Sequence, residues 1–424
     1  MGRILLVTVG SLGDLHPFIA IGRALVAQGR QVLLAVPEDG VAKVRAAGLD
    51  AEPILLSYAS ICARLGLSEE AVAARILADP NFVIDEVLMP DLRSSTARLD
   101  RLAADADVIA GSIFAFCAEI VAEKRRLPLA AVVLQPMSLF SAWQPPVTPR
   151  FGMMRKSPRS RVGRSWNRAC LAMVRTVLRR RYGTRIDAVR AEHGLGASTG
   201  VPMLDHGAAV RAVLCCWSDT LGKLPPDAPD SAALVGFPFF DSESGGDDAL
   251  PPELDAFLHD GDRPLVFTLG SVAVGAAGGF YEQAAAVSRT LGRRALLLTG
   301  QEGPPRRDDA CLWMGYAPHS AVFPHAAAVI HHGGIGTTGQ AVRAGRPQLV
   351  VPHFGDQYDN AVRVETAGLG LSLTRAQFAT PRALAAISRL LSDGDIGRAA
   401  ELAARSIAGD DGAAEAARRI AALR

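Results

Sequence analysis

The sequence has few cysteines and none of the spacings that hold metals or build disulfide frameworks. Its six cysteines are scattered over 424 residues, without a C-x-x-C motif or a cluster of cysteine and histidine. So few isolated thiols are typical of a reducing compartment and exclude a disulfide-stabilised secreted domain. We therefore expect no metal site and a cytoplasmic protein.

Long hydrophobic runs are also missing. No stretch approaches the roughly 18 apolar residues of a membrane-spanning helix. The apolar N-terminus stops at Gly10 and lacks a small-residue cleavage site, so it matches a signal peptide poorly and a buried first strand better.

The chain as a whole lacks a strong charge of either sign. Its formal net charge is +2, and 49% of its residues are hydrophobic. This composition excludes a disordered or fibrous chain and gives no reason to expect nucleic acid as a partner. The length is about two to three times that of a typical domain, so two domains are expected.

Short apolar runs alternate with helical stretches in both halves of the chain. Strands that no polar residue interrupts, separated by helices, indicate a parallel sheet with both faces covered. Strands are predicted at 4–9, 31–36, 108–110, 130–134, 264–268, 295–299, 327–331 and 348–352. Helices are predicted at 17–28, 40–47, 279–291, 336–344 and 359–367.

This pattern predicts an α/β protein with two doubly wound, Rossmann-like domains. Residues 238–249 are rich in Pro, Gly, Ser and Asp, as exposed linkers are, and separate an N-terminal domain (1–237) from a C-terminal domain (250–424). The last helix can pack back on the N-terminal domain. Because open parallel sheets bind ligands beyond the carboxyl ends of their strands, we expect the two sheets to face an interdomain cleft.

The segment 328–340, AVIHHGGIGTTGQ, is a strand that runs through a glycine turn into a helix. Glycines let backbone N–H groups approach an anion, the helix N-terminus adds partial positive charge, and Thr337 and Thr338 offer hydroxyls. The segment therefore predicts a diphosphate site. The alternative is a tight turn that needs glycine for backbone reasons alone.

The same turn contains a G-x-G-x-x-G match at 334–339, with Asp356 downstream as a ribose-binding acid. A nicotinamide enzyme is thus an alternative. Against it, this motif normally follows the first strand of a domain, and here it lies at least two strands into the second domain.

A second polar cluster follows the predicted strand 348–352. Asp356 and Gln357 suit the vicinal hydroxyls of a sugar. The alternative is an N-cap for the next helix, which Asp359 could supply instead.

These segments resemble the donor-binding signature of the family 1 glycosyltransferases of the GT-B fold, the UDP-glycosyltransferase superfamily. The resemblance rests on YAPH at 316–319, HHGGIGTT at 331–338, GRPQ at 345–348 and DQ at 356–357, with GSLGDLHP at 10–17 matching the acceptor loop. It points to bacterial members that act on lipids, sterols and natural products, including rhamnolipid-type rhamnosyltransferases. It covers most of the chain and is weakest between about 57 and 210.

The resemblance implies an inverting transfer of a hexose or deoxyhexose from a UDP- or dTDP-sugar, without a metal or other cofactor. Tyr316 then stacks on the base, His332 contacts the diphosphate, and Gln340 stands where plant members have a ribose-binding glutamate. That amide weakens strict UDP selectivity. The implied donor-binding residues are Gly13, Gly270, Ser271, Tyr316, Ala317, His332, Gly334, Gly336, Thr337, Gln340, Asp356 and Gln357.

Transfer to an alcohol needs a base for the hydroxyl proton. Asp14 aligns with the catalytic histidine of plant members, and burial would raise its pKa. His16 is the rival base. Since both residues precede Pro17, a good first helical residue, the alternative for Asp14 is capping of that helix.

The segment 150–185 carries twelve basic residues and no acidic one; the remaining 33 basic residues face 43 acidic ones, a formal net charge of −10. Within it, Trp166, Cys170, Met173 and Val177 recur at helical spacing. A basic amphipathic helix can lie on the inner face of an anionic membrane, and the alternative is an ordinary surface helix that packs this stripe on the core.

Just before the basic segment, an apolar and proline-stiffened loop contains Met137, Phe140 and Trp143. We expect these residues to bind a hydrophobic, hydroxyl-bearing or lipid-like acceptor, with a buried core loop as the alternative. Three rival functions stay open: a nucleotide-sugar epimerase of the same architecture, an NAD(P)-dependent oxidoreductase, and a non-catalytic sugar-nucleotide binder.

Overall fold

The computed structural model describes residues 2–79, 81–242, 250–270, 274, 277–301, 303–308 and 310–423. They divide into two compact units. Unit 1 comprises Met1–Ser68, Asp79–Phe240 and Asp411–Arg424, and unit 2 comprises Glu69–Ala78 and Asp241–Asp410. The C-terminal segment thus belongs to unit 1. Of the expected linker 238–249, residues 243–249 lie outside the described residues.

Unit 1 is built on a parallel sheet of seven strands in the order β3-β2-β1-β4-β5-β6-β7. Leu5 at its centre pairs with Leu33 on one side and Ile109 on the other. The central strand is buried on both faces because its side chains are apolar in both directions. The strands are β1 (Arg3–Val7), β2 (Val32–Pro37), β3 (Asp50–Leu55), β4 (Ala106–Ser112), β5 (Leu129–Val133), β6 (Val210–Cys215) and β7 (Ala232–Leu234).

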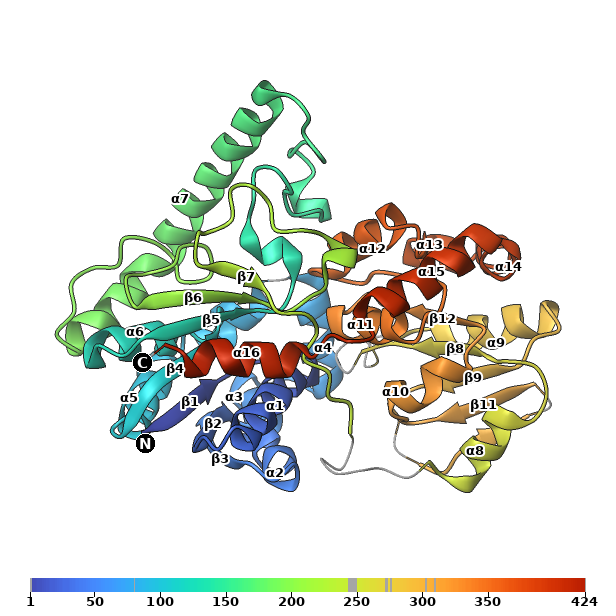
Figure 1. Cartoon of the computed structure of the whole chain (residues 1–424), viewed down its shortest axis with the longest axis horizontal. Helices are drawn as coiled ribbons and strands as arrows, with labels where there is room; N and C mark the ends of the chain where they lie inside the picture. Colours follow the sequence, from blue (N-terminus) through green and yellow to red (C-terminus); the bar gives the residue numbers. More distant parts are fainter. Residues whose placement is uncertain are drawn as a thin grey trace. The chain divides into compact units, whose positions relative to one another are not determined.

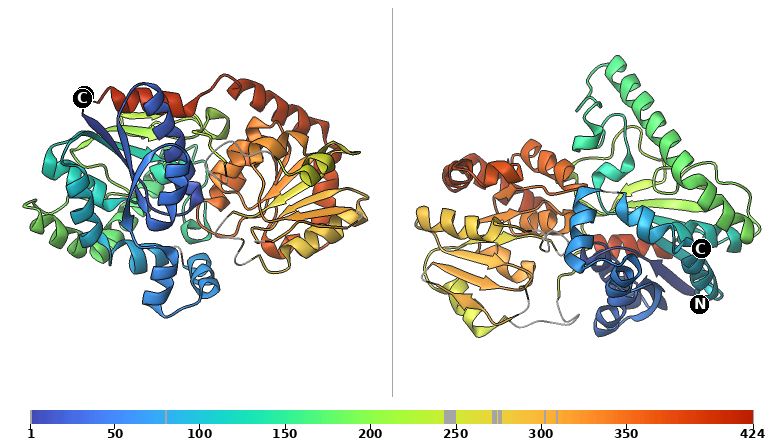
Figure 2. Two further views of the ribbon diagram at one scale, coloured as in Figure 1. Left: turned by 90° about the horizontal axis from the view of Figure 1, so that it is seen from below. Right: turned by 180° about the vertical axis from the view of Figure 1, so that it is seen from behind.

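Helices cover both faces of this sheet (Figures 1 and 2). The main core joins one face to α5, α6 and the C-terminal half of α7, and α1 and α16 pack together on the other face. The helices of unit 1 are α1 (Leu12–Ala27), α2 (Glu38–Ala46), α3 (Tyr58–Leu65), η1 (Ile84–Leu88), α5 (Leu92–Leu102), α6 (Phe116–Arg125), η2 (Pro136–Leu139), η3 (Pro149–Phe151), α7 (Arg161–Glu192), η4 (Asp219–Leu221) and α16 (Gly412–Ala421).

Unit 2 repeats the plan with a second sheet of seven strands, in the order β10-β11-β9-β8-β12-β13-β14. All its pairings are parallel except that of β10 with β11. The strands are β8 (Leu265–Thr268), β9 (Ala295–Leu298), β10 (Arg306–Arg307), β11 (Cys311–Met314), β12 (Ala328–His331), β13 (Gln348–Val350) and β14 (Gly370–Ser372).

Two core clusters, one on each face of the sheet, pack several helices of unit 2 against it. One contains α9 and α14, and the other contains α8, η6 and part of α11. The helices are α4 (Glu69–Ala78), α8 (Pro252–His259), α9 (Phe280–Thr290), α10 (His319–Val322), η6 (Phe323–His325), α11 (Ile335–Arg343), α12 (Gln357–Thr366), α13 (Arg375–Phe378), α14 (Arg382–Ser392) and α15 (Gly394–Ile407). The prediction of two doubly wound α/β domains is confirmed.

Each sheet has one point at which the strand order reverses. In unit 1 this switch point lies between β1 and β4, and in unit 2 it lies between β8 and β12. Loops at the carboxyl ends of such neighbouring strands diverge, which leaves room for a ligand. Asp14 follows β1, and His332 follows β12 next to the loop after β8. The sequence-predicted residues therefore mark both switch points.

Four of the predicted helices begin earlier than expected, and for α1 and α12 the difference concerns a candidate cap. Helix α1 starts at Leu12, with Ser11 as its N-cap, so Pro17 is inside the helix and not its first residue. Helix α12 starts at Gln357, so Asp359 is not its cap: Asp359 is buried and ion-paired with Arg363 at 2.6 Å. In both cases the prediction followed the first strong helix signal and missed the turn before it.

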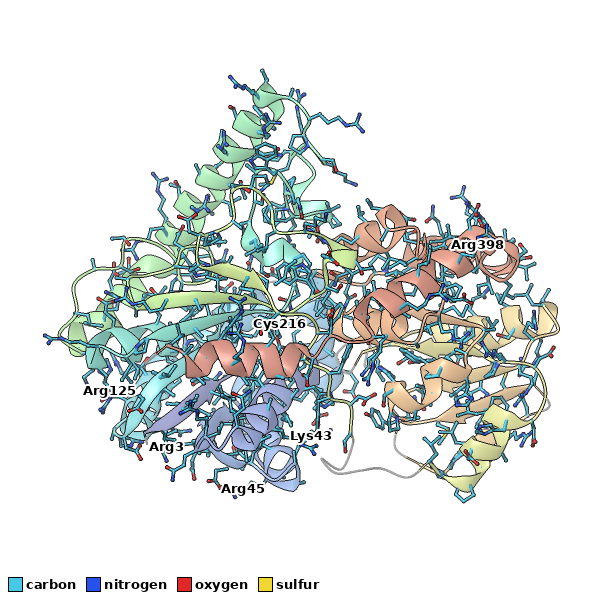
Figure 3. The ribbon with its side chains drawn as sticks, viewed as in Figure 1. Arg3, Lys43, Arg45, Arg125, Cys216 and Arg398 are labelled. Atoms are coloured by element: carbon cyan, nitrogen blue, oxygen red, sulfur yellow. The ribbon has the colours of Figure 1, made fainter. Side chains whose placement is uncertain are left out.

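The six cysteines are buried and unpaired. Figure 3 shows Cys216 within unit 1, whereas Arg45 lies at its surface. In the described part of the chain, no helix combines the length and apolar character that a membrane span requires. Nor does any group of His, Cys, Asp and Glu side chains suited to a metal ion occur within the described ranges.

Candidate active site

A buried histidine sets the direction in which the chain leaves β12. His331 Nδ1 accepts a hydrogen bond from the Gly333 N–H (3.1 Å), and Nε2 donates to Gln348 Oε1 (3.0 Å). Burial lowers the pKa of His331 to about 4, so the ring is neutral and each nitrogen has one role. His331 therefore has a structural role beneath the turn.

The next histidine is held for hydrogen-bond donation. His332 Nδ1 accepts from the Gly270 N–H, at 3.1 Å, across the switch point between β8 and β12. Burial, and then the neighbouring histidines, hold the pKa of His332 well below its usual range. The ring is thus neutral, and because Nδ1 accepts, its proton resides on Nε2.

Glycines surround that Nε2 atom, so no side chain crowds it. A Cβ on Gly270 or on Gly334 would lie within 3.0 Å of His332 Nε2, closer than real Cβ atoms come. Gly333 adopts a φ of +92°, and a side chain there would also collide with β13. The glycines of this turn are therefore required both by the backbone and by the space around the imidazole.

Helix α11 begins at the same place, with its N-terminus open. Its N-cap is Gly334, whose lack of a side chain leaves the first N–H groups of the helix uncapped. Gly336 is exposed and Thr337 is half-buried. The Thr338 hydroxyl, however, donates to the Gly334 carbonyl at 2.9 Å, which corrects the expectation that it serves a phosphate. The turn thus combines N–H groups, one hydroxyl and the His332 Nε2–H, a suitable set for an anion.

Gln340 lies one helical turn beyond Gly336. It is buried, and its Oε1 has no hydrogen-bond partner among the described residues. An unpaired buried carbonyl oxygen is costly, and a hydroxyl donor from a bound molecule would satisfy it. Because the Gln340 side chain is a neutral amide, it adds no negative charge beside the glycine turn.

Asp356 and Gln357 have different roles at the start of α12. Gln357 Oε1 accepts from the N–H groups of His353 (2.8 Å) and Phe354 (3.1 Å), so this oxygen holds the loop and only its Nε2 is left for a ligand. Asp356 is half-buried at the N-cap position, where its side chain makes no capping bond. The pair therefore offers a carboxylate and an amide donor.

Sequence reasoning missed Asn360, which connects these two parts of the site. Its Nδ2 donates to the Gly333 carbonyl (2.9 Å) and to Asp356 Oδ2 (2.8 Å), and the side chain is fully buried. It thereby fixes the carboxylate relative to the glycine turn. Its spacing of four residues from Asp356 on one helix was the available signal.

Tyr316, which is predicted to stack on the nucleotide base, and the donor-binding candidate Ala317 lie just before α10. The Tyr316 hydroxyl donates to the Asp241 carbonyl, and Tyr316 is half-buried. The Ala317 side chain is buried in the core of unit 2, so only its backbone can meet a ligand. Ser271 lies outside the described residues.

In unit 1, Asp14 lies in the first turn of α1, at the end of β1. Its Oδ2 accepts from the Ser11 N–H at 3.0 Å, and a Cβ on Gly10 would collide with its carboxylate. Burial raises the pKa of Asp14 to about 6, against the lowering effect of the Ser11 hydrogen bond. The capping interaction is therefore real, and it leaves a carboxylate that can exchange a proton near neutral pH.

The side chain of His16, the other candidate for the catalytic base, points in a different direction from that of Asp14. Residues two apart on a helix point in different directions, so His16 does not share the side of Asp14. The His16 ring instead meets Phe240 edge to face, with ring centroids 5.3 Å apart. Gly13 is exposed in the same turn of α1, in unit 1, whereas the other donor-binding candidates belong to unit 2.

The predicted acceptor loop is rigidly held. The Asp227 carboxylate accepts from the Ser141 hydroxyl and from the Ala142 N–H (2.8 Å). Phe140 is buried in a small cluster with the inner face of α7, while Met137 and Trp143 are half-buried.

The structure thus brings His332, Gly334, Gly336, Thr337 and Gln340 together on one turn and helix. Asn360 connects them to Asp356. Asp14, His16 and the acceptor loop belong to the other unit.

Comparisons with known proteins identify the family of the chain. Residues 309–423 match the family described as "Erythromycin biosynthesis protein CIII-like, C-terminal domain". The chain is 30% identical to O-mycaminosyltylonolide 6-deoxyallosyltransferase of Streptomyces fradiae, over 86% of this chain and 84% of that protein. It is 28% identical to a sterol 3-beta-glucosyltransferase of Neosartorya fischeri over 99% of its own length, which spans 29% of that longer protein.

Among solved structures, the spinosyn rhamnosyltransferase SpnG, complexed with thymidine diphosphate, superposes with a TM-score of 0.66 at 20% identity. The match covers 99% of this chain and 100% of that one. The expected GT-B fold is therefore confirmed, and with it the expectation of a glycosyltransferase. The chain belongs to the family 1 glycosyltransferases, enzymes that use a nucleotide-sugar donor.

Proposed function

We propose that the protein transfers a hexose or deoxyhexose from a dTDP- or UDP-sugar to a hydroxyl group of a hydrophobic acceptor, with inversion and without a metal. The observation that carries the donor half is His332, whose Nε2–H is presented beside the open N-terminus of α11. The acceptor half rests on the half-buried apolar side chains of Met137 and Trp143.

The leaving diphosphate needs stabilisation as its bond to the sugar breaks. The N–H groups of Gly336 and Thr337, the Thr337 hydroxyl and the His332 Nε2–H donate to its oxygens. Donors that are already fixed in place stabilise developing negative charge without reorganisation. They perform the task that a divalent cation performs in other transferases, so chelation of metals with EDTA leaves turnover unchanged.

The acceptor hydroxyl must lose a proton as it attacks the sugar. We assign Asp14 as the base, because its raised pKa of about 6 brings it closer to the operating pH than an ordinary carboxylate. The attack breaks the bond between the anomeric carbon and the diphosphate from the opposite side, so the product has the inverted anomeric configuration. Nuclear magnetic resonance of the product reads this directly, and retention would exclude the mechanism.

Gln340 favours a thymidine donor. A neutral amide at the sugar-ring position of the nucleotide tolerates a deoxyribose, and the relative from Streptomyces fradiae is named for a 6-deoxy sugar. The spinosyn rhamnosyltransferase structure holds thymidine diphosphate. We therefore expect tighter binding of dTDP than of UDP, which a thermal-shift panel of dTDP, UDP and GDP checks.

The names of the relatives also support a hydrophobic acceptor. One is named for a sterol, and another for O-mycaminosyltylonolide. We assign Met137 and Trp143 to the acceptor, whereas the buried Phe140 holds the loop against α7. Asp356 and the Gln357 amide then read the hydroxyls of the transferred sugar.

The experiment that tests this proposal is turnover of dTDP- and UDP-sugars with a panel of hydrophobic alcohols, with release of the nucleotide diphosphate as the readout. A transferase releases it only when an acceptor is present. Epimerisation of the donor without acceptor would favour the epimerase, and donor binding with no turnover on any acceptor would favour a non-catalytic binder.

A further inference from the structure

The long helix α7 has an apolar stripe on the side that faces away from its own unit. Val162, Trp166, Met173 and Val177 are 74%, 50%, 50% and 56% exposed. At about 100° per residue these four positions fall within one narrow arc, which we call the outer stripe. The sequence pattern had grouped Trp166, Met173 and Val177 with Cys170. Cys170, however, borders this arc and is buried, because it packs against the segment 140–154.

The orientation of α7 is fixed, so the outer stripe cannot turn inward. Cys170 and Leu171 pack in a small core with Phe140 and Met154. The fully buried Asn167 accepts from the Arg155 N–H (2.9 Å) and donates to the carbonyls of Ala142 and Arg155 (3.0 Å each). Rotating the helix would bury the stripe only by breaking all three hydrogen bonds.

The twelve basic residues of the segment 150–185 divide into three groups. Four pair with carboxylates of unit 1, namely Arg150, Arg175, Arg179 and Arg181. Arg164 lies over the Trp143 ring. Seven have no acidic partner among the described residues: Arg155, Lys156, Arg159, Arg161, Arg168, Arg180 and Arg185. We call these seven the free basic set.

Members of the free basic set lie close to the outer stripe. Arg180 continues the stripe at its C-terminal end, and Arg155 to Arg161 lead into its N-terminal end. The Trp166 indole N–H donates to the Met153 carbonyl at 2.9 Å, which places the exposed Met153 beside it. Figure 1 shows the N-terminal half of α7, which carries the outer stripe, projecting beyond the sheet of unit 1.

This combination fits an anionic lipid surface better than a nucleic acid. Apolar side chains such as Val162, Met173 and Val177 gain free energy by entering the boundary between headgroups and acyl chains, whereas they gain little from phosphates and bases. Arginine and lysine beside them attract anionic headgroups. We propose that the outer stripe and the free basic set dock unit 1 on an anionic bilayer.

Residues of α7, the helix that carries the docking surface, also contact the acceptor loop. Asn167 binds the Ala142 carbonyl, and Arg164 lies 4.1 Å from the ring centroid of Trp143. Docking of α7 therefore brings the loop that we assign to a hydrophobic acceptor to the lipid surface. This consequence rests on the proposed function, whereas the docking itself does not.

The test measures vesicle binding by the full chain without any substrate. Flotation with phosphatidylcholine vesicles, with and without phosphatidylglycerol, is expected to recover the protein only with the anionic lipid. Trp166 gives a direct readout: brominated acyl chains are expected to quench its fluorescence, obtained by subtracting the signal of Trp166→Phe.

Two variants and a matched control separate the contributions. Met173→Ser/Val177→Ser and Arg159→Gln/Arg161→Gln are each expected to reduce vesicle binding at least tenfold. Leu402→Ser/Arg405→Gln, on the exposed face of α15 in unit 2, is expected to bind as the parent does. Unchanged thermal transitions show that the variants fold.

Several results would overturn the docking proposal: no flotation with anionic vesicles, undiminished binding by Met173→Ser/Val177→Ser, or tight binding to a DNA duplex that survives the serine substitutions. A dimer whose formation shields Trp166 from quenchers would also overturn it. Since turnover on a water-soluble alcohol is measured separately, failure of docking and failure of the proposed transferase activity are distinguishable.

Discussion

The two switch points have the same topology and opposite chemistry. In unit 1 the helix after the strand receives a carboxylate at its own N-terminus, because Asp14 accepts from the Ser11 N–H. In unit 2 the helix at the switch point is the one that follows β12, the strand on the other side of the reversal, and it begins at Gly334, which has no side chain to offer. One N-terminus is already occupied by an anion from the chain, and the other is left for an anion from outside.

This difference is the reason why we propose unit 2 as the unit that binds the diphosphate. A carboxylate within the first helical turn repels a phosphate, whereas an open N-terminus with a neutral imidazole donor attracts it. The helix after β1 in unit 1 carries instead a carboxylate that can accept a proton. In the proposed mechanism, two units of the same fold thus divide the reaction between proton removal and leaving-group stabilisation.

The largest expected effect comes from removing the base in unit 1. Asp14→Asn keeps an oxygen that can accept from Ser11 but cannot take a proton. Turnover should fall about 100- to 10,000-fold, the usual range for loss of a general base. Steady-state kinetics check this, with His16→Gln as the comparison. Near-normal turnover of Asp14→Asn, or a larger loss for His16→Gln, would transfer the role to His16.

In unit 2, a single methyl group should close the anion site. Gly334→Ala places a Cβ within 3.0 Å of His332 Nε2, so we expect dTDP affinity to fall at least about tenfold, a cost of about 1.4 kcal/mol. Gly397→Ala on α15, where a Cβ meets nothing within 4 Å, is the control. Calorimetric titration measures both, and equal affinities would remove the anion site from this turn.

Asn360 tests whether the two halves of the donor site act together. Asn360→Ala removes the hydrogen bonds to Gly333 and Asp356, so we expect a loss of about 1–3 kcal/mol in the free energy of unfolding. Asn360→Asp keeps the shape but sets a carboxylate against Asp356. The KM for the donor should rise in both variants while the KM for the acceptor does not, and the opposite pattern would contradict a positioning role.

The pH dependence of the activity should follow the titration of Asp14 in unit 1 and not that of His332 in unit 2. Activity should fall as one group protonates near pH 6, because the pKa of Asp14 is raised to about 6, while His332 stays neutral above that range. The raised pKa also costs stability. In the unfolded chain Asp14 ionises near pH 4, so the folded state loses up to about 3 kcal/mol between pH 4 and pH 6.

Asp14→Asn removes this penalty, and its thermal transition should therefore exceed that of the parent at pH 7.5 more than at pH 4.5. Thermal denaturation of both proteins at pH 7.5 and at pH 4.5 measures this difference. A pH-independent difference would show that the Asp14 carboxyl does not titrate in this range.

The smallest effect distinguishes two adjacent hydroxyls of the glycine turn. Thr337→Val should weaken dTDP binding about two- to tenfold, the value of one hydrogen bond, whereas Thr338→Val should change it less than about twofold because that hydroxyl serves the Gly334 carbonyl. Calorimetric titration compares them. A larger effect at Thr338 would reverse the assignment.

Local patterns predicted much of this molecule. The apolar runs at β1 and β12 indicate buried parallel strands, and they predicted two doubly wound domains. The glycines before α11 indicate a turn that can approach an anion, and they predicted the candidate anion site. The resemblance supplied the roles of Asp14 and His332, which no spacing rule provides.

The remaining features depend on tertiary contacts. Asn360 matters because Gly333 and Asp356 come within its reach, and the Thr338 hydroxyl is used because its own helix supplies an acceptor. Cys170 faces inward and Met173 outward because the loop at 140–154 packs on only one side of α7. Helical spacing alone could not show which side that is.

The division of labour between the two switch points is tested most directly by calorimetric titration of dTDP into the parent, Asp14→Asn and His332→Ala. We predict that Asp14→Asn binds dTDP as the parent does, while His332→Ala binds it at least about tenfold more weakly. Weaker binding by Asp14→Asn together with unchanged binding by His332→Ala would contradict the account.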